Sequence, residues 1–62
     1  MTAKKEKLFS YYYNLMSKEY REEILSYEDF DMKNVWCSIK VNFKSGDWIR
    51  VYQKMDGQVE WY

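Results

Sequence analysis

The sequence has one cysteine and no histidine with which to do chemistry. Cys37 therefore lacks the histidine that usually serves as the base for a cysteine nucleophile, and histidine is also the commonest general acid or base in enzymes. The same two counts exclude an intramolecular disulfide and a metal site built from Cys and His. We interpret Cys37 as a small apolar core residue rather than as a nucleophile.

Three short patterns begin like functional motifs but lack residues that such motifs need. Asp29-Phe30-Asp31 starts like a calcium loop, but the residues that follow provide neither further oxygen ligands nor the required glycine. The segment Lys44-Ser45-Gly46-Asp47 has too few glycines for a phosphate loop and is typical of a hairpin turn. Glu22 and Glu23 are adjacent on a predicted helix and point to different faces, so they do not pair. We predict that the protein is not an enzyme and uses no cofactor or metal.

The length of 62 residues supports a single domain, because a chain of this size buries only about 60% of its unfolded surface. Three Trp, seven Tyr and three Phe supply the large side chains that so small a core needs. No stretch approaches the roughly 20 apolar residues that cross a bilayer, and the N-terminus is not followed by the apolar core of a signal peptide. We expect one soluble, cytoplasmic domain over residues 1–62 with no membrane contact.

The N-terminal half has the periodicity of amphipathic helices. Leu8, Tyr12 and Leu15 recur at spacings of three and four residues, which places them on one helix face. Ser17 is suited to cap a second helix, which would continue to about Tyr27. The pattern predicts helical structure over about residues 3–27, as one bent helix or as two short helices.

The C-terminal half changes to the two-residue alternation of β-strands. The loops Lys44–Gly46 and Met55–Gly57 each end in a glycine, as three-residue hairpin loops with a bulge do. Loops of this length bring all apolar residues to one side of the sheet, with three pairs facing each other: Val41 with Ile49, Ile39 with Val51, and Val51 with Trp61. The sequence thus predicts an α+β domain in which the helical segment packs on a three-stranded antiparallel β-meander, about residues 34–62.

The other face of the predicted sheet is rich in aromatic and basic side chains. Seven of them are candidates for binding a partner: Trp36, Lys40, Trp48, Arg50, Tyr52, Lys54 and Tyr62. Trp, Tyr and Arg dominate the binding energy of protein interfaces, whereas aromatics interleaved with cations can also stack the bases of single-stranded nucleic acid. Aromatic residues are also favoured in strands for packing alone, and a helix could cover this face.

A second candidate surface is acidic. Residues 19–31 contain one base and six acids: Glu19, Glu22, Glu23, Glu28, Asp29 and Asp31. Such a segment is either a solvated helix face or a patch that docks on a basic partner, since clustered charges steer association.

These patterns favour a small non-enzymatic protein-interaction domain, an accessory or inhibitory subunit whose protein partner the sequence does not identify. A homodimer through the aromatic face or a sheet edge is a further way to bury surface that so short a chain exposes. The alternative is a module that binds single-stranded nucleic acid through the same face. The formal net charge of zero argues against that alternative, because general nucleic-acid binders are basic.

Overall fold

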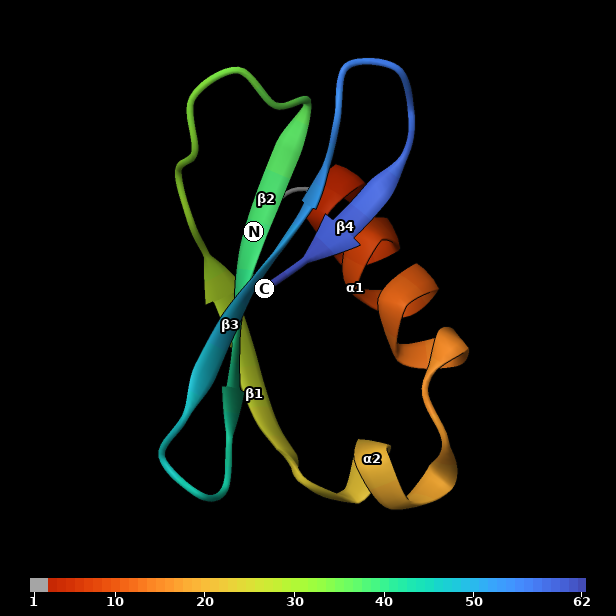
Figure 1. Ribbon diagram of the computed structural model, residues 1–62, viewed down its shortest axis with the longest axis vertical. Helices are drawn as coiled ribbons and strands as arrows, with labels where there is room; N and C mark the ends of the chain where they lie inside the picture. The colour runs from red at the N-terminus through yellow and green to blue at the C-terminus, as the bar shows by residue number, and fades with distance from the viewer. Residues whose placement is uncertain (1–2) are drawn as a thin grey trace.

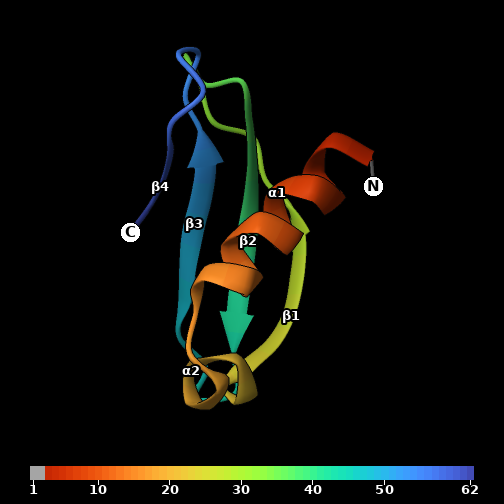
Figure 2. The same cartoon turned by 90° about the vertical axis from the view of Figure 1, so that its right-hand side faces the viewer.

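A computed structural model describes residues 3–62 and confirms the α+β class. Helices α1 (Ala3–Leu15) and α2 (Lys18–Glu22) precede four strands: β1 (Ile24–Asp29), β2 (Cys37–Phe43), β3 (Trp48–Gln53) and β4 (Val59–Trp61). The strands form one antiparallel sheet in the order β1-β2-β3-β4. Helix α1 crosses one face of this sheet, which we call the inner face, and the opposite one is the outer face (Figures 1 and 2).

The helical segment consists of two short helices that break at Ser17. The Ser17 hydroxyl accepts a hydrogen bond from the Tyr20 N–H and so caps the start of α2. From α2, Arg21 reaches back to the end of α1 and donates to the carbonyls of Tyr13 (2.9 Å) and Asn14 (3.2 Å). Carbonyls at a helix C-terminus lack intrahelical partners, so Arg21 fastens the two helices together.

The prediction that the second helix continues to Tyr27 is wrong, because residues 24–29 form strand β1 at the edge of the sheet. The register of β1 with β2 shifts between Ile24 and Ser26, so an extra residue bulges there. The bulge leaves Ile24 and Tyr27 both packed against the core although they are three residues apart, which is also a helical spacing. The sheet therefore has four strands instead of three.

The predicted register of the other three strands is confirmed. The observed pairs include Val41 with Ile49, Ile39 with Val51, and Val51 with Trp61. Each connecting loop ends in a glycine with positive φ, at 97° for Gly46 and 96° for Gly57. The hydrogen bonds that close the two loops, from Phe43 N–H to the Asp47 carbonyl and from Lys54 N–H to the Gln58 carbonyl, leave three residues in each turn.

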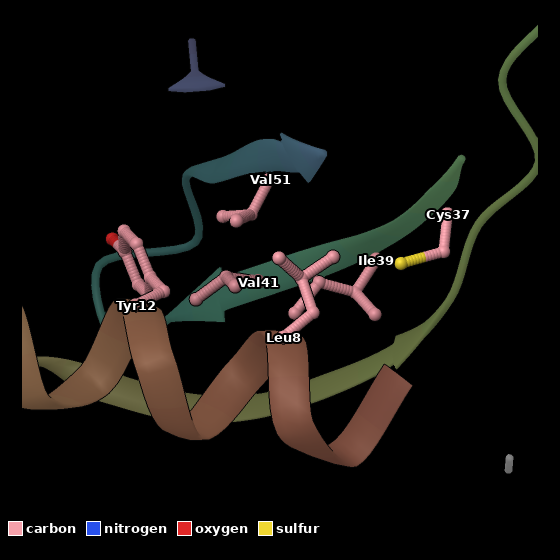
Figure 3. Packing of buried hydrophobic residues seen from close by; sticks show 6 residues of the cluster. All are labelled: Leu8, Tyr12, Cys37, Ile39, Val41 and Val51. Carbon is pink, nitrogen blue, oxygen red and sulfur yellow. The ribbon is translucent and has the colours of Figure 1, made fainter. Parts of the chain in front are cut away.

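The hydrophobic core lies between α1 and the inner face (Figure 3). Its fully or nearly buried side chains are Leu8, Tyr12, Cys37, Ile39, Val41 and Val51. Cys37 is a free, buried thiol on the inner face, as the alternation predicted. Burial raises the pKa of this thiol, and the positive charges of Lys4 and Lys5 lower it by less. Within residues 3–62, no helix combines the length and apolar character needed to span a bilayer.

Candidate functional site

The outer face of the sheet is the best candidate for a binding surface. Both helices of the described chain lie on the other side, so neither covers it (Figure 2). Five of the seven sequence-predicted residues of this face come together on it: Lys40, Trp48, Arg50, Tyr52 and Tyr62. We call these five residues the outer-face cluster.

The outer-face cluster is built from alternating cations and aromatic rings. The Trp48 ring contacts two cations, with its centroid 4.7 Å from Lys40 Nζ and 4.8 Å from Arg50 Cζ. The same guanidinium carbon is 4.4 Å from the centroid of Tyr62, whose ring meets that of Tyr52 edge-on at 6.0 Å. Each cation over a ring gains about 0.5–1 kcal/mol at an exposed site, so these contacts favour the observed arrangement of the side chains before any partner binds.

The strand register explains why these side chains meet. Lys40 lies directly opposite Arg50, and Arg50 exchanges two backbone hydrogen bonds with Tyr62. Side chains at directly opposed positions of neighbouring strands lie within contact distance. The two like charges of Lys40 and Arg50 would repel each other there, and the electron-rich ring of Trp48 offsets that repulsion.

Phe30 belongs to this surface, although it lies outside the strands that the alternation predicts. Its ring centroid lies 5.7 Å from that of Trp48. Its carbonyl accepts a 2.5 Å hydrogen bond from Ser38 Oγ on β2, which fixes the chain at the end of β1. The signal was the alternation Ser26, Glu28, Phe30, which indicates one sheet face only once β1 is known to be a strand.

Lys54 lies at the border of the outer-face cluster rather than within it. Its ammonium group is 3.8 Å from the carboxylate of Glu60. Glu60 also accepts a 3.0 Å hydrogen bond from the hydroxyl of Tyr52. This hydrogen bond raises the pKa of Tyr52, because a phenolate would lose the bond and face a carboxylate.

Trp36, which the alternation assigned to the outer face, lies against helix α1 instead. The Nζ atom of Lys4 is 3.9 Å from the centroid of its ring. The Trp36 N–H donates to the carbonyl of Gln53, and Cys37 is also opposite Gln53, so two residues face one at this point. Such a β-bulge interrupts the alternation of side chains, which is why the assignment of Trp36 was wrong.

The six acidic residues of the second candidate surface do not form one patch. All six are exposed, but Glu19, Glu22 and Glu23 lie at α2, while Asp31 lies past the opposite end of β1 (Figure 1). Asp29 pairs with Lys5 of α1. Glu28 accepts a 3.0 Å hydrogen bond from Asn42 and lies opposite Lys40, so it borders the outer-face cluster. The structure thus divides the acidic segment between α2, the edge strand β1 and the loop that follows it.

The described residues include no group of three or more His, Cys, Asp or Glu side chains that could hold a metal. What the outer face offers is apolar ring surface, ring edges and the donors of Lys40 and Arg50. Comparison of the chain with protein-family models, with curated proteins and with solved structures found no match. Its function is therefore inferred from this geometry alone.

Proposed function

We propose that the protein is a small non-enzymatic interaction domain, an accessory or inhibitory subunit that binds a protein partner through its outer-face cluster. The observation that carries this proposal is the position of Arg50 between the rings of Trp48 and Tyr62, on a sheet face that no helix of residues 3–62 covers. Trp, Tyr and Arg are the residues most enriched at the energetic centres of protein interfaces.

Preorganisation supports this proposal. Binding usually costs about 0.5–1.5 kcal/mol for each flexible side chain that becomes ordered at the interface. Arg50 and Lys40 are long side chains, yet ring contacts already restrict both of them in the free protein. A partner would therefore meet a surface whose ordering cost is partly met before association.

A protein fits this surface better than single-stranded nucleic acid does. A base would have to stack on Trp48, whose ring already contacts Lys40, Arg50 and Phe30. The cations are also balanced by acids at the border, Glu28 near Lys40 and Glu60 near Lys54. Nucleic-acid grooves need a clear excess of positive charge.

The acidic residues have a secondary part in this proposal. Glu28 and Glu60 border the outer-face cluster, where they would orient a partner that carries basic side chains at its own rim. Glu19 and Glu22 on α2 lie away from the cluster and would act only by steering the approach. A cytoplasmic location suits the free thiol of Cys37, because that compartment keeps thiols reduced.

The proposal is tested by affinity capture from the cells that produce the protein, followed by binding measurements on the captured and purified partner. Trp48→Ala and Arg50→Ala should each lose at least about 2 kcal/mol of binding free energy, as alanine substitutions of residues at the centre of an interface do. Leu15→Ala is the control, because it removes a large exposed apolar side chain from α1, on the other side of the sheet, and should bind like the wild type. Equal binding by Trp48→Ala and the wild type would overturn the proposal.

Two further measurements separate the alternatives. A labelled oligothymidine should not bind at physiological salt; tight binding that weakens steeply with salt, through counterion release, would favour the nucleic-acid alternative. Light scattering measures the mass in solution. A dimer that Trp48→Ala dissociates would show that a second copy, rather than a different protein, occupies the outer face.

A further inference from the structure

A groove of about 410 Å³ opens on the inner side of the molecule, between α1 and the hairpin that joins β3 to β4. Leu8 and Tyr11 line it from the helix, Val59 lines it from β4, and Trp36 lines it from the position just before β2. The groove lies on the opposite side of the sheet from the outer-face cluster, so the proposed function does not use it.

The groove has an apolar floor and aromatic walls. Leu8 is 4% exposed and belongs to the core, whereas Tyr11 and Trp36 are 51% and 54% exposed. Large aromatic side chains that stand half open beside a buried floor still have apolar surface to lose when a ligand binds. A single apolar side chain placed between the two rings would cover them and rest on Leu8.

The charges around the groove have one sign. Lys4 and Lys7 line it, and no acidic side chain does so among the described residues. These two lysines are three residues apart on α1 and therefore lie on the same helix face, about 4.5 Å apart along its axis. Lys4 is held against the ring of Trp36, 3.9 Å from its centroid, which places its ammonium group at the groove.

We infer that this groove binds an acidic peptide segment of a partner protein. The segment would seat an apolar side chain between Tyr11 and Trp36 and pair carboxylates with Lys4 and Lys7. In an extended chain, side chains two residues apart lie on the same side at about 6.6 Å, a spacing that lets two acids reach two long lysine side chains three residues apart on a helix. Nucleic acid would need more cations than these two.

The inference is tested with a displayed library of random twelve-residue peptides. Selection uses the folded wild-type protein, and counter-selection uses the double variant Lys4→Glu/Lys7→Glu, in which both changes are at exposed positions. The enriched peptides should carry two or more acids next to an aromatic or leucine residue. Failure to enrich any peptide over the counter-selected variant would overturn the inference, and so would enrichment of basic peptides.

The best enriched peptide is then synthesised with a dye, and its affinity is measured by fluorescence anisotropy. Tyr11→Ala and Trp36→Ala should each weaken binding about tenfold or more, and Lys4→Glu/Lys7→Glu should weaken it further and reduce its salt dependence. The charge control is Lys18→Glu/Lys33→Glu, at two exposed lysines that do not line the groove, and it should bind within about twofold of the wild type.

Trp48→Ala separates this inference from the proposed function. It should leave peptide affinity unchanged, because Trp48 is on the outer face. If Trp48→Ala abolishes peptide binding while Trp36→Ala does not, the peptide occupies the outer face and the assignment to the groove is wrong. A dimer that Trp36→Ala dissociates would place a second copy in the groove and would equally overturn the inference. Circular dichroism of each variant verifies that the fold is intact.

Discussion

At the scale of single residues, Tyr12 shows how a polar atom is accommodated in so small a core. The side chain is fully buried between α1 and the sheet, and its hydroxyl lies 2.5 Å from that of Tyr20. The two rings also meet edge-on, at 6.2 Å. Burial first, and the hydrogen bond to Tyr20 second, raise the pKa of Tyr12 above its ordinary value, so the folded protein requires a neutral phenol at this position.

This requirement predicts a loss of stability in alkali. The pKa of Tyr12 is near 10 in the unfolded chain and higher in the folded protein, so the folded state retains a proton that the unfolded state releases. The free energy of unfolding should therefore fall as pH rises above about 10. Tyr12→Phe should cost about 1 kcal/mol at pH 7, through the lost hydrogen bond, but should decline less with pH.

Urea unfolding at pH 7, 9 and 10.5 measures both effects. Tyr52→Phe is the comparison: the pKa of Tyr52 is also raised, mainly by its hydrogen bond to Glu60, so this variant should reduce the alkaline loss of stability less than Tyr12→Phe does. The pKa of the buried Cys37 thiol is also raised, so its ionisation lowers stability in alkali too. This thiol is present in the wild type and in both variants, so it does not affect their comparison. If the free energies of unfolding of the wild type and of Tyr12→Phe fall in parallel from pH 9 to 10.5, the ionisation of Tyr12 does not cause the loss of stability in alkali.

At the scale of elements, local sequence signals at the two hairpins specify how their strands pair. Gly46 ends the loop between β2 and β3 at φ 97°, a region that side chains with a Cβ rarely adopt. A methyl group added there would meet no atom within 4 Å, so its cost would be conformational and not steric. We expect Gly46→Ala to lower the free energy of unfolding by about 1–2 kcal/mol.

Thermal denaturation followed by circular dichroism checks the role of Gly46. Gly46→Asn should cost less than Gly46→Ala, because asparagine tolerates positive φ better than other residues do. Lys44→Ala is a matched control in the same loop, at an exposed position, and should leave the midpoint almost unchanged. Equal stability of Gly46→Ala and the wild type would show that the loop adopts another turn.

The elements that could be predicted from sequence are those whose signals are local. The β2–β3 and β3–β4 hairpins were predictable because their signals are local: a glycine at each turn and alternation along each strand. Strand β1 was not predictable, because its bulge places Ile24 and Tyr27 on one face at a helical spacing and only pairing with β2 determines its conformation. Most of the outer-face cluster followed from the alternation, whereas Trp36 and Phe30 depend on a bulge and on β1, respectively.

At the scale of the whole molecule, a four-stranded sheet with its helices on one side leaves two surfaces with different compositions. The outer-face cluster combines aromatic rings with Arg50 and Lys40, and the groove beside α1 combines rings with Lys4 and Lys7. The groove lies beside α1 on the inner side and the cluster lies on the outer face, so the sheet separates them and a partner on one would not block the other. An accessory subunit of this architecture could hold two protein segments at once.

The two faces should also respond differently to truncation, because only the inner one forms the core. A chain of 62 residues is expected to have a free energy of unfolding on the order of 3–9 kcal/mol. Ile39 is fully buried, so Ile39→Ala should remove about 2–5 kcal/mol, a large part of the total. Trp48 is 40% exposed and Tyr52 half-buried, both on the outer face, so Trp48→Ala/Tyr52→Ala should cost much less.

Urea unfolding of the three proteins, monitored by circular dichroism, compares these costs directly. The expected order of stability is wild type, then Trp48→Ala/Tyr52→Ala, then Ile39→Ala, with the free energy of unfolding of the last lowered by at least about 2 kcal/mol. If the double variant unfolds, the outer face is a structural layer and the proposed interface loses its basis. If Ile39→Ala is as stable as the wild type, Ile39 is not a core residue, and the assignment of the two faces would have to be exchanged.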